Sequence, residues 1–85
     1  MNIEYNKLAV KFLNKADKDA QQAIRSHISG LLKIPPIGDI KPLQGKHNIY
    51  RLRIGKYRLL FSYKERVGEK VLYIENIGTR GDIYK

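Results

Sequence analysis

The chain has 85 residues, with 17 lysines and arginines against eight aspartates and glutamates, so its formal net charge is +9 and its pI is near 9.9. This length suits a single domain over residues 1–85, because a second hydrophobic core would not fit. The absence of cysteine excludes a disulfide scaffold and thiolate metal sites, and two histidines, His27 and His47, are too few for a typical zinc site. We therefore expect no metal and no cofactor.

The positive charge narrows the classes of partner. A domain pI above about 9 is expected of nucleic-acid-binding proteins. A lysine-rich surface on an ordinary soluble protein, or an acidic protein partner, would also account for it. No run approaches the roughly 18 apolar residues of a membrane span, so we expect no membrane partner. No signal peptide is visible at the first residues, and the lack of cysteine fits an intracellular protein, so we expect a cytoplasmic location.

The first half of the chain predicts a strand followed by a helical hairpin. Ile3 and Tyr5 alternate with polar neighbours, which predicts a short strand over residues 2–6. Apolar residues at helical spacing then predict a first helix from Lys7 to about Ala16. Asp17 is suited to cap a second helix. The apolar stripe of that helix consists of Ala20, Ile24, Ile28, Leu31 and Leu32.

The second half predicts strands. Pro35 and Pro36 end the helical pattern, and residues 34–48 are expected to form a loop. Runs rich in β-branched and aromatic residues then predict strands over 49–54, 57–64 and 70–77, and residues 82–85 suit a further edge strand. We therefore expect an α+β fold: an N-terminal strand, a helical hairpin, and an antiparallel sheet of three to four strands with the helices on one face.

The run Ile-Tyr-Arg-Leu-Arg-Ile-Gly-Lys-Tyr-Arg-Leu-Leu-Phe at residues 49–61 predicts a tight hairpin. A glycine in the first position of a two-residue turn, here Gly55-Lys56, suits a type II′ turn. Directly paired residues of an antiparallel ladder project to the same side. The turn predicts the pairs Ile54–Tyr57, Arg53–Arg58, Leu52–Leu59, Arg51–Leu60 and Tyr50–Phe61. One side of the hairpin is then apolar, and the other, the arginine face, carries Arg51, Arg53 and Arg58.

The arginine face has two interpretations. Arg53 and Arg58 are expected to have Cβ atoms about 5 Å apart, where like charges repel, and neither strand supplies an acidic residue to relieve them. The face is either a solvated basic surface with its guanidinium groups in water, or a preformed site for a phosphate, which suits convergent arginine forks. Near the C-terminus, Arg80 lies between two glycines and can swing onto this face, and Tyr84 offers a phenol or a stacking ring.

These residues together resemble the RelE/ParE superfamily of bacterial and archaeal toxins. The resemblance covers the whole chain in its order of segments. It rests on Leu43-x-Gly45, on Tyr50-Arg51-x-Arg53-x-Gly55-x-Tyr57-Arg58-x-x-Phe61, and on Gly78-x-Arg80 with a C-terminal Tyr84. It implies a RelE-like fold and a toxin of a type II toxin–antitoxin system. RelE-like members are mRNA interferases that act in the ribosomal A site without a metal, by attack of a ribose 2′-OH on the adjacent phosphate.

The resemblance also implies roles for individual residues. Arg58 and Arg80 fall on arginines that bind the scissile phosphate, and Tyr84 falls on a tyrosine that orients the substrate. Arg51 and Arg53 fall on two basic positions that are often lysine. The expected catalytic set is Arg53, Arg58, Arg80 and Tyr84. Arg51, Lys46 and Lys56 are expected to hold RNA. The implied partners are a cognate antitoxin, acidic and RelB-like, together with the ribosome and mRNA.

Two departures from the family pattern concern proton transfer. Arginine, with a pKa above about 12, exchanges protons less readily than the lysine of many relatives at the position of Arg53. Many relatives also carry histidine where this chain has Thr79, and His47 is a weaker substitute because it lies in a predicted loop. Two other functions therefore stay open: a ParE-like, non-enzymatic inhibitor of DNA gyrase, and a basic RNA-binding or antitoxin-binding module without catalysis.

Overall fold

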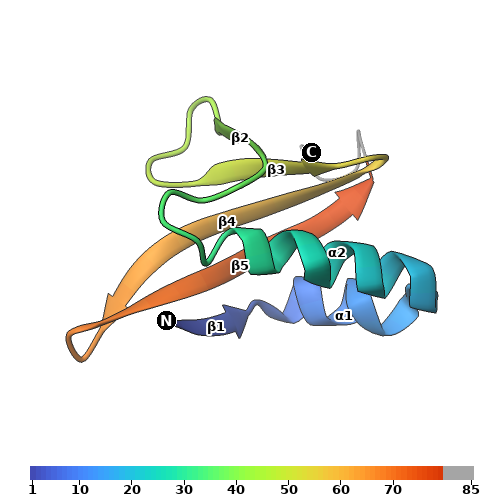
Figure 1. Cartoon of the computed structure of the whole chain (residues 1–85), viewed down its shortest axis with the longest axis horizontal. Coiled ribbons are helices and arrows are strands. Elements are labelled where there is room, and N and C mark those ends of the chain that lie inside the picture. Colours follow the sequence, from blue (N-terminus) through green and yellow to red (C-terminus); the bar gives the residue numbers. More distant parts are fainter. Residues whose placement is uncertain (80–85) are drawn as a thin grey trace.

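A computed structural model describes residues 1–79 and shows two helices packed on a five-stranded sheet (Figure 1). The strand order is β1-β5-β4-β3-β2; β1 runs parallel to β5 and the other neighbours are antiparallel. The expected α+β fold is thereby confirmed. The elements in chain order are β1 (Asn2–Tyr5), α1 (Lys7–Lys15), α2 (Lys18–Gly30), β2 (Asp39–Pro42), β3 (Tyr50–Ile54), β4 (Tyr57–Arg66) and β5 (Glu69–Thr79).

Both helices begin at a side-chain cap. The Asn6 side-chain oxygen accepts a hydrogen bond of 2.9 Å from the backbone N–H of Leu8, and the Asp17 carboxylate accepts one of 2.8 Å from Ala20. Such caps satisfy N–H groups that have no partner inside the helix. The predicted cap at Asp17 is confirmed, and the helices follow each other with only Ala16 and Asp17 between them.

Helix α2 ends at Gly30, earlier than its apolar stripe predicts, because the following loop returns onto it. The N–H of Ile37 donates a hydrogen bond of 2.9 Å to the Gly30 carbonyl. A Cβ atom on Gly30 would lie 2.9 Å from the Ile37 carbonyl oxygen, so only glycine allows this approach. Leu31 then closes the helix as its C-cap and is fully buried.

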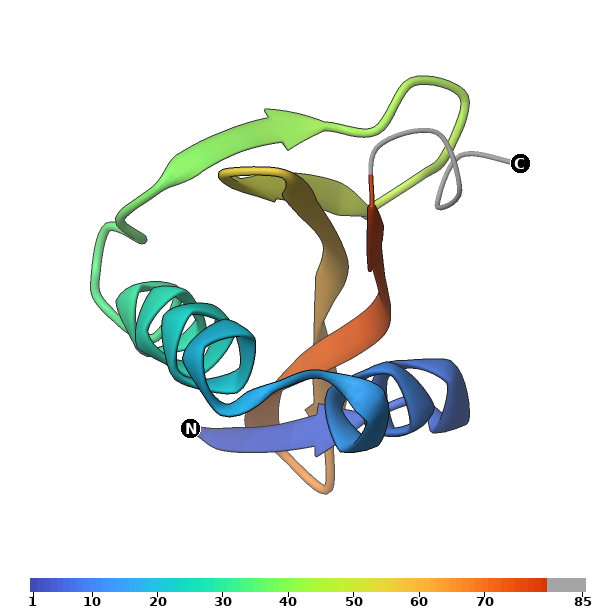
Figure 2. The same cartoon turned by 90° about the vertical axis from the view of Figure 1, so that its right-hand side faces the viewer.

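The core lies between the helices and one face of the sheet. Figure 2 shows the sheet curving from β1 (blue, bottom) to β2 (light green, top) with α2 (teal) inside the curve. The helices contribute Ala9, Leu13, Ile24 and Ile28, and the sheet contributes Leu52, Ile54, Leu59, Phe61, Leu72, Ile74 and Ile77. All of the expected apolar hairpin residues belong to this core or pack against it, so the opposite side of the hairpin is left to the arginines.

Tyr63 ties the end of α2 to the sheet. Its hydroxyl donates a hydrogen bond of 2.8 Å to the Leu31 carbonyl, which has no partner within the helix. Burial raises the pKa of the Tyr63 phenol above its usual value of 10.0, and the nearby Tyr50 phenol raises it further, because both disfavour the ionised form.

The prediction of a loop over residues 34–48 is wrong at β2. Asp39–Pro42 pairs with β3 along the register Asp39–Arg53, Ile40–Leu52, Lys41–Arg51 and Pro42–Tyr50. This strand is a short edge of the sheet, where proline is tolerated because its missing N–H can face away from the ladder. Only Ile40 is partly buried, so the strand has too little apolar alternation to be recognised from sequence.

The other strand predictions are close in position. The described strands extend the two long predicted ones, to Arg66 in β4 and to Thr79 in β5. They join at a turn in which Val67 and Gly68 both have positive φ. The edge strand predicted for residues 82–85 lies outside the described residues. None of the helices within residues 1–79 is long and apolar enough to cross a membrane.

Candidate phosphate-binding face

The predicted hairpin register is confirmed. β3 pairs with β4 as Tyr50–Phe61, Arg51–Leu60, Leu52–Leu59, Arg53–Arg58 and Ile54–Tyr57. Gly55 has φ of +56° and Lys56 has no positive φ, as a type II′ turn requires. The arginine face therefore exists as expected, on the side of the sheet opposite the helices, with Arg53 and Arg58 as direct cross-strand neighbours.

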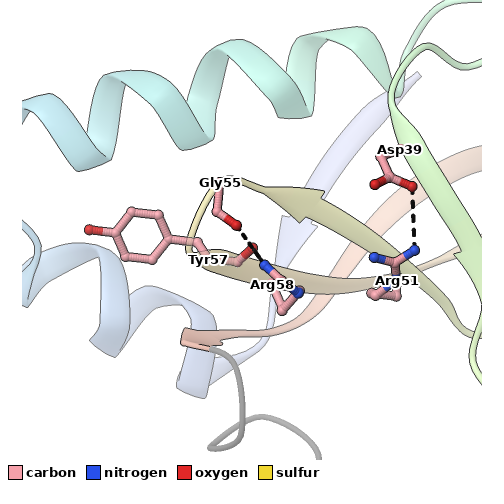
Figure 3. A network of polar contacts seen from close by, with 5 residues as sticks. All are labelled: Asp39, Arg51, Gly55, Tyr57 and Arg58. Atoms are coloured by element: carbon pink, nitrogen blue, oxygen red, sulfur yellow. Dashed lines mark hydrogen bonds and ion pairs between the residues drawn. The ribbon is translucent and has the colours of Figure 1, made fainter.

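Arg58 is buried, which the sequence did not indicate. Only 6% of its surface is exposed, and its Nη1 donates hydrogen bonds of 2.7 Å to the Gly55 carbonyl and 2.8 Å to the Tyr57 carbonyl (Figure 3). The guanidinium thus bends back toward the turn of its own hairpin. Carbonyl oxygens carry partial negative charge, so these bonds offset part of the cost of burying a cation.

Arg51 has an acidic neighbour that the hairpin sequence did not reveal. Its Nη2 lies 3.4 Å from Oδ1 of Asp39, which belongs to β2 (Figure 3). The Arg51 side chain is 14% exposed and that of Asp39 is 51% exposed. An ion pair with one solvent-exposed partner is worth at most about 1 kcal/mol, so Asp39 orients Arg51 more than it stabilises the fold.

Arg53 is the most accessible of the three arginines. It is exposed, whereas Arg51 is half-buried and Arg58 is buried. In the register Arg53 lies between Arg58 on one side and Asp39 on the other. The guanidinium groups of Arg51 and Arg58 turn toward Asp39 and the turn carbonyls respectively, which relieves the crowding and leaves Arg53 available to an incoming anion.

A second polar cluster occupies the same side of β4, farther from the turn. The Ser62 hydroxyl donates a hydrogen bond of 2.7 Å to Oε2 of Glu75, and Nζ of Lys64 lies 3.9 Å from the same oxygen. Lys64 also sits 4.0 Å from the centroid of the Tyr73 ring. Glu75 is the extra residue of a β-bulge in β5, and such bulges redirect side chains. Sequence periodicity alone misses this cluster because the bulge breaks the alternation.

The remaining predicted site residues are placed as follows. Lys56 and Lys46 are exposed; Lys56 is in the hairpin turn, with Nζ 5.4 Å from the Tyr57 ring centroid. His47 is exposed in the loop before β3. Arg80 and Tyr84 lie outside the described residues. Within residues 1–79, no three histidine, aspartate or glutamate side chains are grouped so that they could hold a metal ion.

The arginines of the described part of the site offer fixed positive charge, which suits an anionic ligand. Two carboxylates lie on the same side of the sheet: Asp39 contacts Arg51, and Glu75 contacts Ser62 and Lys64 in the second cluster.

The site thus belongs to a small α+β protein that has a curved sheet, a helical hairpin on one side of it and a basic hairpin face on the other. A family comparison makes this assignment specific: the chain belongs to the family described as the ParE toxin of type II toxin–antitoxin system, parDE, which matches residues 3–84.

Solved structures support the same fold. The chain is 25% identical to a protein of the archaeal RelE–RelB complex from Pyrococcus horikoshii, with a TM-score of 0.69 over 95% of this chain and 96% of that one. It is 20% identical to the isolated Escherichia coli RelE toxin, with a TM-score of 0.74 over 98% and 89%. It is 18% identical to a YoeB/ParE toxin from Agrobacterium tumefaciens, with a TM-score of 0.75 over 94% of this chain and 99% of that one. No match was found among curated proteins.

Proposed function

We propose that this toxin is a ribosome-dependent endoribonuclease that cleaves mRNA by attack of a ribose 2′-OH on the adjacent phosphate. The attack forms a 2′,3′-cyclic phosphate and breaks the bond to the 5′ oxygen of the next nucleotide, which leaves as a 5′-hydroxyl after protonation. The observation that carries the proposal is the arginine face, where Arg51, Arg53 and Arg58 gather on one side of a hairpin. Phosphate suits several converging arginine forks in both charge and geometry. The formal net charge of +9 also attracts the protein as a whole to the negatively charged backbone of RNA.

The proposed chemistry depends on positioning and charge. The exposed Arg53 binds the scissile phosphate, and Arg58, held by the turn carbonyls, supplies fixed positive charge beneath it. Both oppose the negative charge that develops on the crowded phosphorane, and one such group is commonly worth about 10²–10³ in rate. Arginine does not exchange protons near neutral pH. We therefore assign proton transfer to Tyr84, with Arg80 as a further phosphate ligand.

The proposed partners follow from the same charge. RNA in the ribosomal A site is the substrate, held also by Lys46 and Lys56. An acidic, RelB-like antitoxin neutralises the toxin in the cytoplasm. Support comes from the Pyrococcus horikoshii relative, whose structure is a complex of RelE with RelB.

The test is transcript mapping by primer extension after induction of the toxin in translating cells. The Arg53→Ala variant is expected to lose cleavage by about 100-fold or more. Arg25→Ala is a matched control, because Arg25 is exposed on α2 and its loss removes the same charge. If Arg53→Ala cleaves mRNA as fast as the wild type, the proposed role of the arginine face is wrong.

Inhibition of DNA gyrase without RNA cleavage is the second candidate. Two observations favour it: the family that matches is described as ParE toxins, and Arg58 bonds to its own turn. A gyrase supercoiling assay with the purified protein distinguishes the candidates. Loss of supercoiling with intact cellular mRNA would favour the gyrase inhibitor. Absence of both activities, with unaffected growth, would favour a binding module without catalysis.

A further inference from the structure

Glu75 is a carboxylate on the arginine side of the sheet to which the proposed mechanism gives no role. It is the extra residue of the bulge in β5, just before Asn76, which pairs with Leu60. The Asn76 side-chain oxygen accepts a hydrogen bond of 2.9 Å from the N–H of Ile77, and this local contact supports the irregular backbone. Bulges redirect side chains and are common next to active sites, so the position of this carboxylate is a built-in feature of the strand.

One oxygen of the Glu75 carboxylate is held in place and the other is open. The Ser62 hydroxyl donates a hydrogen bond of 2.7 Å to Oε2, and Nζ of Lys64 lies 3.9 Å from the same oxygen. Ser62 is buried, with 4% of its surface exposed, whereas the Glu75 side chain is 23% exposed. Within residues 1–79, Oε1 of Glu75 accepts no hydrogen bond. The carboxylate is therefore oriented through Oε2 and can accept a proton on Oε1.

The Glu75 carboxylate and the arginines border one strip of the sheet. Leu60 lies between them, because it pairs with Arg51 on β3 and with Asn76, the neighbour of Glu75, on β5. Adjacent strands are about 4.8 Å apart, so the two ladder steps separate the backbones of Arg51 and Asn76 by about 10 Å. Attack requires the 2′ oxygen within about 3–3.5 Å of the phosphorus. A phosphate at the arginines therefore places its neighbouring ribose over Leu60, on the side toward Glu75.

The other carboxylates near this side of the sheet are occupied by arginines. Asp39 lies beyond Arg51, and its Oδ1 is 3.4 Å from the guanidinium of that residue. Glu4 forms an ion pair of 3.0 Å with Arg66, at the far end of β4. Glu75 is held instead by a neutral hydroxyl and, at the longer distance of 3.9 Å, by an ammonium group. It is therefore the carboxylate best placed to take part in chemistry at the arginine face.

We propose that Glu75 removes the proton from the attacking 2′-OH and that Ser62 is the residue that positions it. This inference rests on the proposed endoribonuclease function. As Oε1 of Glu75 takes the proton, the 2′ oxygen bonds to phosphorus, the bond from phosphorus to the 5′ oxygen breaks, and the 5′ oxygen takes a proton from Tyr84. Water then accepts the proton from Glu75 and returns one to Tyr84. A carboxylate suits the first transfer because it is ordinarily ionised at neutral pH, and a phenol suits the second because it is ordinarily protonated.

The test is single-turnover cleavage of mRNA in the A site of translating ribosomes, measured over a series of toxin concentrations. Glu75→Gln keeps the size of the side chain and an oxygen for the Ser62 hydroxyl, but an amide does not take up the proton. We expect the maximal cleavage rate to fall about 100-fold or more. The half-saturating toxin concentration should stay within about twofold of wild type, because the lost interaction acts in the transition state. Glu75→Asp keeps a carboxylate and should recover at least about tenfold of the lost rate.

The matched control is Glu69→Gln, which makes the same chemical change on the same strand. Glu69 is exposed and pairs with Arg66 beside the distant β4–β5 turn. The variant should cleave within about twofold of wild type, since solvent and salt screen a distant surface charge. Circular dichroism at the assay temperature checks that each variant is folded.

Ser62 is tested as a positioning residue. Ser62→Ala should lower the maximal rate about tenfold, because the carboxylate loses its fixed orientation, while the half-saturating concentration stays constant. Ser62→Thr restores a hydroxyl and should recover most of that rate. A merely structural role would lower the folded fraction of Ser62→Ala and leave the maximal rate per folded molecule unchanged.

Three results would overturn the role of Glu75. An equal maximal rate for Glu75→Gln and wild type would exclude it as the proton acceptor. A defect of Glu75→Gln that disappears at saturating toxin would make it a binding residue. An equal loss in Glu69→Gln would reduce the effect to overall charge. Full activity of Glu75→Gln beside an inactive Arg53→Ala would refute this role alone, whereas absence of cleavage by the wild type would overturn the proposed function as well.

Discussion

Replacing Arg58 by alanine separates its structural role from its proposed catalytic one. The buried guanidinium donates two hydrogen bonds from Nη1 to the carbonyls of Gly55 and Tyr57. Hydrogen bonds that involve a charged group contribute about 1.5–3 kcal/mol each. Loss of both is partly offset because the cross-strand repulsion with Arg53 also disappears. We expect the free energy of unfolding to fall by about 2–3 kcal/mol.

Urea unfolding followed by circular dichroism at the helical band measures this change. With a slope near 1 kcal/mol per molar for a domain of this size, the midpoint should fall by about 2–3 M. The melting temperature should fall by roughly 10–20 °C. Arg53→Ala is the matched control, because it removes an arginine from the directly paired position, where the side chain is exposed. Its stability should stay within about 0.5 kcal/mol of wild type.

Two results would refute this reasoning. If Arg58→Ala unfolds at the same urea concentration as wild type, the hydrogen bonds to the turn do not stabilise the hairpin. If Arg53→Ala is destabilised equally, burial does not distinguish the two arginines. The expected difference also decides how activity data are interpreted: a loss of cleavage in Arg58→Ala combines misfolding with chemistry, whereas a loss in Arg53→Ala reports on chemistry.

Further predictions concern the loop contact, a tyrosine and the acidic neighbour. Gly30→Ala should destabilise by about 1–3 kcal/mol in thermal melts, despite better helix propensity, because its Cβ would meet the Ile37 carbonyl at 2.9 Å; a more stable variant would contradict this. Tyr63→Phe should cost about 1 kcal/mol at neutral pH through its lost hydrogen bond. Because burial raises the pKa of this phenol above 10.0, the stability that the Tyr63 hydroxyl contributes is present below pH 10 and is lost as the pH rises through the raised pKa. The difference in unfolding free energy between wild type and Tyr63→Phe should therefore shrink above pH 10. A difference that stays constant there would contradict the prediction. Asp39→Asn should strengthen binding of single-stranded RNA about two- to fivefold at low salt, because it frees Arg51 from its ion pair with Asp39 at 3.4 Å. Unchanged RNA affinity would show that this ion pair does not restrain Arg51.

Local patterns in the sequence were sufficient to predict the register of the β3–β4 hairpin and the residues at which the helices begin. A two-residue turn beginning with Gly55 sets the register, and the side-chain period of two then separates the arginines from the apolar residues. Asp17 identifies the start of α2 because capping depends on residues within one turn. These features involve neighbours along the chain or across a tight turn, so they can be deduced without the rest of the fold.

Contacts between distant segments decided the rest of the site. β2 becomes a strand only because the edge of β3 is available to pair with it, and that pairing brings Asp39 to Arg51. The bulge at Glu75 depends on how β4 and β5 align over their length. The sequence by itself therefore determined that three arginines share one side of a hairpin. Only the tertiary structure decided which arginine is buried, which is paired and which is open to a ligand, because burial and ion pairing depend on residues brought together from separate parts of the chain.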